Sequence, residues 1–275
     1  NTRIYCGVII DNTYLYMGTD NGILIYNYRT DRYEQPATDF PTDVRTMALQ
    51  GDTLWIGALN GLYTYQLQNR KLSPLGTKRN GLPHNTIYSI IRTGDNQIYV
   101  GTYNGLCRYI ASNGKFEKIP LPVNSSQSNL FVNSLLEDTG RQCIWIGTEG
   151  YLFQYFPSTG QMKQTEAFHN NSIKSLALDG NGYLLAGTDN GLYVYHNDVT
   201  PLQHIIHDSR NIQSLTNNII WNIFADQEHN IWLGTDYGIS LSRYNSALQF
   251  IPISQITGTG DGNQFYSLFR DSKGF

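Results

Sequence analysis

The sequence predicts an all-β protein of the β-propeller class, because one motif recurs at a nearly constant spacing along the chain. The motif is an apolar run ending in Gly-Thr, a tight turn closed by a second glycine, and a run ending in tyrosine, as in residues 231–244. Its first glycine, the anchor glycine, occurs as Gly18, Gly57, Gly101, Gly147, Gly187 and Gly234. By subtraction, the spacings are 39, 44, 46, 40 and 47 residues. A period of about 40–45 residues is typical of propeller blades.

The residues around each anchor repeat as well. Two residues before it stand Tyr16, Trp55, Tyr99, Trp145, Leu185 and Trp232. One residue after it stand Thr19, Ala58, Thr102, Thr148, Thr188 and Thr235. A tyrosine stands eight residues after the first five anchors and ten after the last: Tyr26, Tyr65, Tyr109, Tyr155, Tyr195 and Tyr244. We interpret the repeated aromatic residues as packing between neighbouring blades.

Each copy has the pattern of four short strands. In the third copy, residues 86–92 and 97–102 are rich in aliphatic and aromatic residues and are separated by Gly-Asp-Asn, a turn signal. A Tyr-Asn-Gly turn follows, in which glycine supplies the positive φ of a tight hairpin. Residues 106–110 and 116–119 complete the set. Four antiparallel strands make one propeller blade.

The copies divide the chain into consecutive blades. We expect them at residues 1–40, 41–83, 84–129, 130–171, 172–216 and 217–262, with a partial blade at 263–275. The last segment matches the start of a seventh copy. The prediction is therefore one seven-bladed propeller, with its seventh blade incomplete, cut from a longer polypeptide.

The fourth copy departs from the motif. Its turn glycine, Gly150, comes one place early, and Tyr151 fills the usual glycine position. Since a tyrosine with positive φ is unfavourable, this turn must be of another type.

Composition excludes several functions. The net charge is −3 and only 15% of residues are charged, so we expect no contact with nucleic acid. Cys6, Cys107 and Cys143 lie in different copies without metal-ligand spacing, and we predict neither a disulfide framework nor a metal or cofactor site. The sequence has no run of 18 apolar residues that would span a membrane. Many polar and few charged residues suit a neutral polar ligand or a protein surface.

One position in each copy varies while its neighbour does not. The first strand of each copy carries a small residue near its start: Gly7, Thr46, Ser89, Ser134, Ser175, Asn222 and Ser267. The residue before it differs from copy to copy: Cys6, Arg45, Tyr88, Asn133, Lys174, Trp221 and Tyr266. Such a set could serve recognition, although the position could also be merely exposed and unconstrained. Trp221 is the best candidate for stacking on a sugar ring, and three turn tyrosines are further candidate contacts: Tyr103, Tyr151 and Tyr237.

Residues 230–245, with 214–226 before them, resemble the two-component regulator propeller repeat. The resemblance extends over the whole chain and implies the periplasmic sensor region of a hybrid two-component histidine kinase from glycan-degrading gut bacteria. It also implies an oligosaccharide ligand, signalling across the inner membrane to glycan-use genes, a homodimer, and a second propeller and an immunoglobulin-like domain in the same chain. The motif marks scaffold positions, so no binding residue transfers by it.

Two other functions remain open. A glycosidase needs two carboxylates at a defined separation, whereas the rim carboxylates Asp20, Glu149, Asp189 and Asp236 belong to different copies. A lyase would need a cluster of basic or aromatic groups, but the histidines share no motif. We therefore expect no catalysis by this chain, with kinase activity in another part of the protein. A protein-interaction or dimerisation scaffold without its own ligand is the second alternative.

Overall fold

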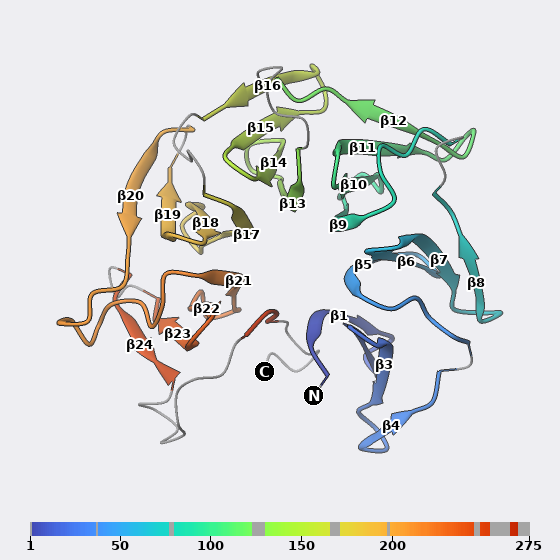
Figure 1. Cartoon of the computed structure of the whole chain (residues 1–275), viewed down its shortest axis with the longest axis horizontal. Helices are drawn as coiled ribbons and strands as arrows, with labels where there is room; N and C mark the ends of the chain where they lie inside the picture. Colours follow the sequence, from blue (N-terminus) through green and yellow to red (C-terminus); the bar gives the residue numbers. More distant parts are fainter. Residues whose placement is uncertain are drawn as a thin grey trace. The chain divides into compact units, whose positions relative to one another are not determined.

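The computed structural model describes residues 2–36, 38–76, 80–122, 130–165, 171–196, 199–244, 248–253 and 265–268. Its strands form six four-stranded sheets, and in each sheet the strands are neighbours in chain order (Figure 1). The pairing is antiparallel. The chain divides into two compact units, Asn1–Glu137 and Asp138–Phe275. The prediction of an all-β protein with four antiparallel strands per blade is confirmed.

The first unit contains the first three sheets and the first strand of the fourth. The first sheet is β1 (Ile4–Ile10), β2 (Tyr14–Thr19), β3 (Gly22–Asn27) and β4 (Arg32–Glu34). The second is β5 (Val44–Gln50), β6 (Thr53–Ala58), β7 (Gly61–Gln66) and β8 (Lys71–Pro74). The third is β9 (Ile87–Arg92), β10 (Ile98–Thr102), β11 (Gly105–Ile110) and β12 (Lys115–Ile119).

The second unit contains the remaining strands. The fourth sheet joins β13 (Val132–Asp138) to β14 (Cys143–Thr148), β15 (Leu152–Phe156) and β16 (Gln161–Gln164). The fifth is β17 (Ile173–Leu178), β18 (Leu184–Thr188), β19 (Gly191–Tyr195) and β20 (Pro201–Ile205). The sixth is β21 (Ile220–Ala225), β22 (Ile231–Thr235), β23 (Gly238–Ser242) and β24 (Phe250–Pro252).

The structure does not support the predicted seventh blade. The described residues make six sheets, and 265–268 form no strand. These four residues instead lie against the sixth sheet, where the amide of Phe265 donates to the carbonyl oxygen of Thr235 at 3.0 Å and that of Leu268 to Oδ1 of Asn222 at 3.1 Å. The rest of 263–275 lies outside the described residues. Among the described residues, the segment contacts the sixth blade and adds no strand of its own.

The anchor glycines set how closely one sheet approaches the next. A Cβ at Gly18 would lie 2.7 Å from Cγ1 of Val44, the first residue of the second sheet. A Cβ at Gly57 would lie 2.6 Å from Cγ2 of Ile87, the first residue of the third. The same contact joins Gly101 to Val132, Gly187 to Ile220 and Gly234 to Phe265. Real Cβ atoms do not approach so closely, so these positions require glycine for its lack of a side chain.

The threonine after the anchor holds the tight turn. In the third sheet, the hydroxyl of Thr102 donates to the carbonyl oxygen of Gly105 at 2.9 Å and accepts from the amide of Asn104 at 3.1 Å. Gly105 has a φ of 102°, which disfavours any side chain there. The same two hydrogen bonds occur at Thr19, Thr188 and Thr235. The Gly-Thr pair therefore combines a close approach between sheets with a fixed hairpin.

The fourth turn is of another type, as its sequence predicts. Gly150 takes the positive φ of 85°, and Tyr151 is not among the residues with positive φ. The hydroxyl of Thr148 still donates to the carbonyl oxygen of Tyr151, at 3.0 Å.

The repeated tryptophans are tied to the end of the first strand of their own sheet. Nε1 of Trp145 donates to Oδ2 of Asp138 at 3.1 Å, and Nη1 of Arg141 lies 2.7 Å from the same oxygen. Burial acts to raise the pKa of the Asp138 carboxyl, but the hydrogen bonds from Trp145 and Arg141 outweigh it and hold the pKa below its usual value. Nε1 of Trp232 donates in the same way to Asp226 at 2.8 Å. Trp145 is fully buried, which confirms its predicted packing role.

In the part of the chain that the structure describes, three apolar clusters fill the space between successive sheets within the two units. One joins the first and second sheets around Leu54 and Ile56. Another joins the second and third around Trp55, Ile87 and Cys107. The third joins the fifth and sixth around Leu185, Ile231, Phe250 and their neighbours. Packing between neighbouring blades is therefore the core of each unit.

The anchor contact predicts a large effect of one methyl group. In Gly101→Ala, the new Cβ would lie 2.7 Å from the backbone oxygen of Val132, so the third sheet must move or strain. We expect the free energy of unfolding to fall by about 1–3 kcal/mol, measured by urea denaturation. Gly94→Ala in the same blade is the control, because its Cβ would meet nothing closer than 3.6 Å. Equal stability of the two variants would contradict the role of the anchor.

The lowered pKa of Asp138 predicts that stability falls in acid. A depressed pKa in the folded state stabilises the protein above the unfolded pKa, and this contribution is lost as the pH falls through the folded pKa. The melting temperature should therefore drop between about pH 5 and pH 3. Asp138→Asn should melt lower at pH 7 and show a shallower dependence on pH, whereas Asp39→Asn, at an exposed position, should follow the wild type. An unchanged slope in Asp138→Asn would contradict this assignment.

Candidate functional site

The variable residue of each first strand lies in a β-bulge. In the second sheet, Val44 pairs with Ala58 and Thr46 with Gly57, so Arg45 is an extra residue without a cross-strand partner. The same shift in register occurs in the first, third, fifth and sixth sheets. We call the extra residues the bulge residues: Tyr5, Arg45, Tyr88, Lys174 and Trp221. A bulge re-aims a side chain away from the regular alternation of the strand.

The predicted position in the first copy is wrong by one residue. Cys6 pairs with Gly18, as Thr46 pairs with Gly57. The small scaffold residue of the first sheet is therefore Cys6 rather than Gly7, and the variable residue is Tyr5 rather than Cys6. Burial raises the pKa of the Cys6 thiol to about 12. The sequence hides this offset, since both alignments place a small residue at the scaffold position.

Bulge residues of neighbouring sheets contact each other in two places. In the first unit, the guanidinium of Arg45 lies 3.9 Å from the centre of the Tyr5 ring and 3.4 Å from Oδ1 of Asp43. In the second unit, Nζ of Lys174 lies 4.5 Å from the centre of the Trp221 ring. Cation–π contacts of this kind hold both partners in place. Four of the five bulge residues therefore form two contacting pairs, Tyr5 with Arg45 and Lys174 with Trp221.

Trp221 is held on more than one side. Its Nε1 donates to Oδ1 of Asp236 at 3.1 Å, and its ring lies 5.1 Å from that of Tyr266 at an angle of 54°. With Lys174 over the ring, the structure brings together three of the predicted residues: Lys174, Trp221 and Tyr266. A ligand that stacks on Trp221 must fit among these neighbours.

The third sheet carries an aromatic cluster. The rings of Tyr88 and Phe131 are 6.0 Å apart, those of Tyr103 and Phe131 are 4.2 Å apart, and His84 lies 4.9 Å from Tyr103. The predicted residues Tyr88 and Tyr103 are therefore joined through Phe131, which was not among the residues predicted from the sequence. Phe131 directly precedes β13, and this place next to a first strand is the only signal it carries.

The other predicted residues stand apart from these clusters. Asn133 is the second residue of β13 and is half-buried. Tyr151 lies 5.8 Å from Phe153, ring to ring, in the fourth sheet. Tyr237 is 52% exposed in the turn between β22 and β23.

The rim carboxylates hold turns and neighbouring groups. Asp20 accepts from the amide of Arg3 at 3.2 Å, Asp189 from that of Ser172 at 3.1 Å, and Asp236 from the Trp221 indole. Among the described residues, no group of three His, Cys, Asp or Glu side chains could hold a metal ion. In the part of the chain that the structure describes, no helix has the length and hydrophobicity to cross a membrane.

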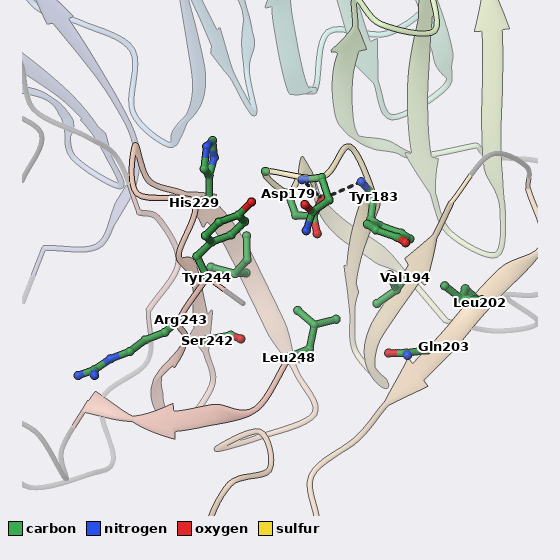
Figure 2. Close-up of a pocket in the computed structure, with 13 residues that line it drawn as sticks. Asp179, Tyr183, Val194, Leu202, Gln203, His229, Ser242, Arg243, Tyr244 and Leu248 are labelled. Carbon is green, nitrogen blue, oxygen red and sulfur yellow. Dashed lines mark hydrogen bonds between the residues drawn. The ribbon is translucent and has the colours of Figure 1, made fainter. Parts of the chain in front are cut away.

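A pocket of about 240 Å³ lies between the fifth and sixth sheets and was not predicted (Figure 2). It is lined on one side by the β17–β18 turn and β19, with Tyr183 and Val194, and on the other by His229 and Tyr244. Leu248 lies at its floor. Two features of the sequence could have indicated it: Leu185 replaces the usual aromatic residue, and the last tyrosine comes two residues late, as Tyr244.

Comparison with known proteins identifies relatives of the repeat. A family model described as two component regulator propeller matches residues 81–104 and 214–237. Each match runs from the segment before a first strand to the tight turn. A histidine kinase P4 of Formosa agariphila is 29% identical to this chain over an alignment of 282 residues. The alignment includes 91% of this chain and 19% of the kinase.

Solved structures show the same relationship. Two crystal structures of an extracellular domain from B. thetaiotaomicron, described once as a one component system and once as a hybrid two component system, are 92% identical to this chain with a TM-score of 0.86. They cover 99% of this chain, which spans 37% and 36% of those domains. The WD40 repeats of RRP9 share the fold at a TM-score of 0.69 and 13% identity. The resemblance to the propellers of two-component sensors is confirmed, and the neighbours support a location outside the cytoplasm.

Proposed function

We propose, from the premise that this chain carries two-component regulator propeller repeats, that it is a ligand-sensing part of a hybrid two-component histidine kinase and that its ligand is an oligosaccharide. The observation that carries the proposal is the set of bulge residues. Their backbone position is constant from sheet to sheet, their side chains differ, and two pairs of them are in contact, Tyr5 with Arg45 and Lys174 with Trp221. A scaffold that fixes the position and leaves the side chain free is suited to recognition.

The chemistry of these residues favours a sugar. Aromatic side chains with a polar tip bind surfaces that are apolar on one face and hydroxylated at the edge, and Tyr5, Tyr88 and Trp221 are of this kind. Arg45 and Lys174 supply hydrogen-bond donors beside them. The low share of charged residues, 15%, agrees with a ligand that is mainly neutral.

Two clusters are the proposed contacts. In the second unit, the ammonium group of Lys174 lies 4.5 Å from the centre of the Trp221 indole ring. A sugar ring would stack on Trp221 either by displacing this ammonium group or by accepting a hydrogen bond from it. In the first unit, the ring of Phe131 lies 6.0 Å from that of Tyr88 and 4.2 Å from that of Tyr103, so several ring faces are grouped there. Asn133 and Tyr151 on the fourth sheet and Tyr237 on the sixth are further candidate contacts.

Signalling follows from a difference in affinity between two arrangements of the sensor. A ligand that binds one arrangement more tightly shifts the population toward it, and a distant kinase can respond to that shift. In this proposal the chain lies in the periplasm of a homodimeric inner-membrane protein, next to a second propeller and an immunoglobulin-like domain. Its output is the transcription of glycan-use genes.

The test is isothermal titration of the complete extracellular region with a panel of oligosaccharides. Trp221→Ala and Tyr88→Ala should each weaken binding of the recognised glycan by about tenfold or more. Tyr33→Ala is the matched control, since Tyr33 is 68% exposed on β4 and belongs to neither cluster. A glycan bound equally by all variants would move the site away from the bulge residues.

A scaffold without its own ligand is the second candidate. It is favoured by exposed apolar side chains at and beyond β20, namely Leu202 at 59%, Ile206 at 50% and Ile212 at 75%. Residues of this kind are common where one protein surface meets another. Tight dimerisation of the extracellular region with no heat of glycan binding would support this function and exclude the first.

A further inference from the structure

We infer that the pocket between the fifth and sixth sheets binds a single neutral sugar ring, separately from the bulge residues. The inference deepens the proposed function, because it gives the sensed glycan a second contact on this chain. It begins from the way the repeat fills the space between neighbouring sheets.

In other blade pairs, an aromatic pair closes this space. Trp55 of the second sheet lies 4.9 Å from Tyr109 of the third, ring centre to ring centre. Tyr16 and Tyr65 belong together to the cluster between the first and second sheets. Each pair consists of the residue two before one anchor glycine and the tyrosine eight after the next.

The fifth and sixth sheets lack both members of the pair. The position before the anchor is Leu185, and the position eight after the next anchor is Ser242, which pairs with Ile231 as Tyr65 pairs with Leu54. Replacing a tryptophan or tyrosine by leucine and a tyrosine by serine removes most of the aromatic volume. Ser242 lines the pocket, so the place of the missing tyrosine is open there, whereas Leu185 is fully buried in the cluster between the two sheets.

The missing tyrosine has moved to the wall of the pocket. Tyr244 stands two residues beyond Ser242, is 42% exposed, and has its ring 5.1 Å from that of His229. His229 in turn packs closely against Gly180, where a Cβ would come within 2.4 Å of its ring. Tyr244, whose counterpart fills the space between two sheets elsewhere in the chain, therefore forms one side of the open pocket (Figure 2).

The lining has the composition of a sugar site. Val194, Ile231 and Leu248 make an apolar floor that continues the buried cluster between the two sheets. Around it stand the hydroxyls of Tyr183 and Tyr244 and the amides of Asn181 and Gln203, and no hydrogen bond joins these four groups to another described side chain. Hydroxyls and amides both donate and accept, which matches the hydroxyls of a sugar better than a ligand with one fixed charge.

The charge and the size of the pocket further restrict the class of ligand. Oδ1 of Asp179 accepts hydrogen bonds from the backbone amides of Asn181 and Tyr183, at 2.9 and 2.7 Å. These bonds compensate much of the charge of the carboxylate. The side chain of Arg243 extends away from Asp179 (Figure 2), so the pocket does not offer the paired charges that an amino acid would need. A volume of about 240 Å³ is below the roughly 300–1,000 Å³ of sites for drug-sized ligands. It fits one ring, such as the end of a glycan chain.

The experiment uses the complete extracellular region and free monosaccharides, with saturation-transfer NMR to detect binding of each neutral pyranose or pentose. Tyr244→Ala removes a wall, and Gln203→Trp places a large ring at the mouth from the exposed strand β20. Both should abolish the transfer signal of the sugar that the wild type binds. Tyr33→Ala and Gln161→Trp, the same substitutions at exposed sites on β4 and β16, should leave it unchanged.

The outcomes separate this site from the proposed sensor site. A monosaccharide signal lost in Tyr244→Ala and Gln203→Trp but kept in Trp221→Ala and Tyr88→Ala establishes the pocket as an independent sugar site, whatever those two variants do to oligosaccharide binding. A signal that survives both pocket variants, or no signal from any monosaccharide with the wild type, overturns the inference. Binding of a free amino acid in competition with the sugar overturns the ligand class.

Discussion

The contact between each anchor glycine and the first residue of the following sheet is the constraint on which the other features depend. Because a Cβ at Gly18, Gly57 or Gly101 would overlap the next strand, the sheets within a unit approach each other closely at this level. The threonine that follows then fixes the adjoining hairpin. Backbone geometry, more than side-chain identity, determines where each sheet begins.

That rigidity explains why neighbouring positions can vary. The bulge places one extra residue just before the small residue that faces the anchor glycine, so the extra side chain takes no part in the contact between the anchor glycine and the following sheet. Tyr5, Arg45 and Lys174 can therefore differ without disturbing the scaffold. The same separation holds farther along the blade, where the loss of one aromatic pair leaves a pocket while the apolar cluster behind it remains complete.

The sequence predicted the features that repeat locally and missed those that depend on contacts between copies. The strands, the Gly-Thr turns and the shifted turn at Gly150 follow from short-range chemistry, and all are present. The seventh blade is not supported, because residues 265–268, the described part of that segment, carry the start of the pattern but add no sheet. Phe131 and the pocket could not be derived, since each requires knowing which residue of one copy faces which residue of the next. Leu185 and Tyr244 could be recognised in the sequence as departures from the repeat. That both departures belong to the same pair of neighbouring blades, where the pocket lies, is seen only in the structure.

The three cysteines of this chain are all free thiols, and Cys107 and Cys143 are buried. Burial raises the pKa of each thiol, to about 12 for Cys6. Thiol–disulfide exchange proceeds through the thiolate, which these residues rarely form near neutral pH. A compartment that oxidises exposed cysteines would therefore leave them unreacted, so the fold can keep small sulfur-containing side chains in its core on either side of a membrane.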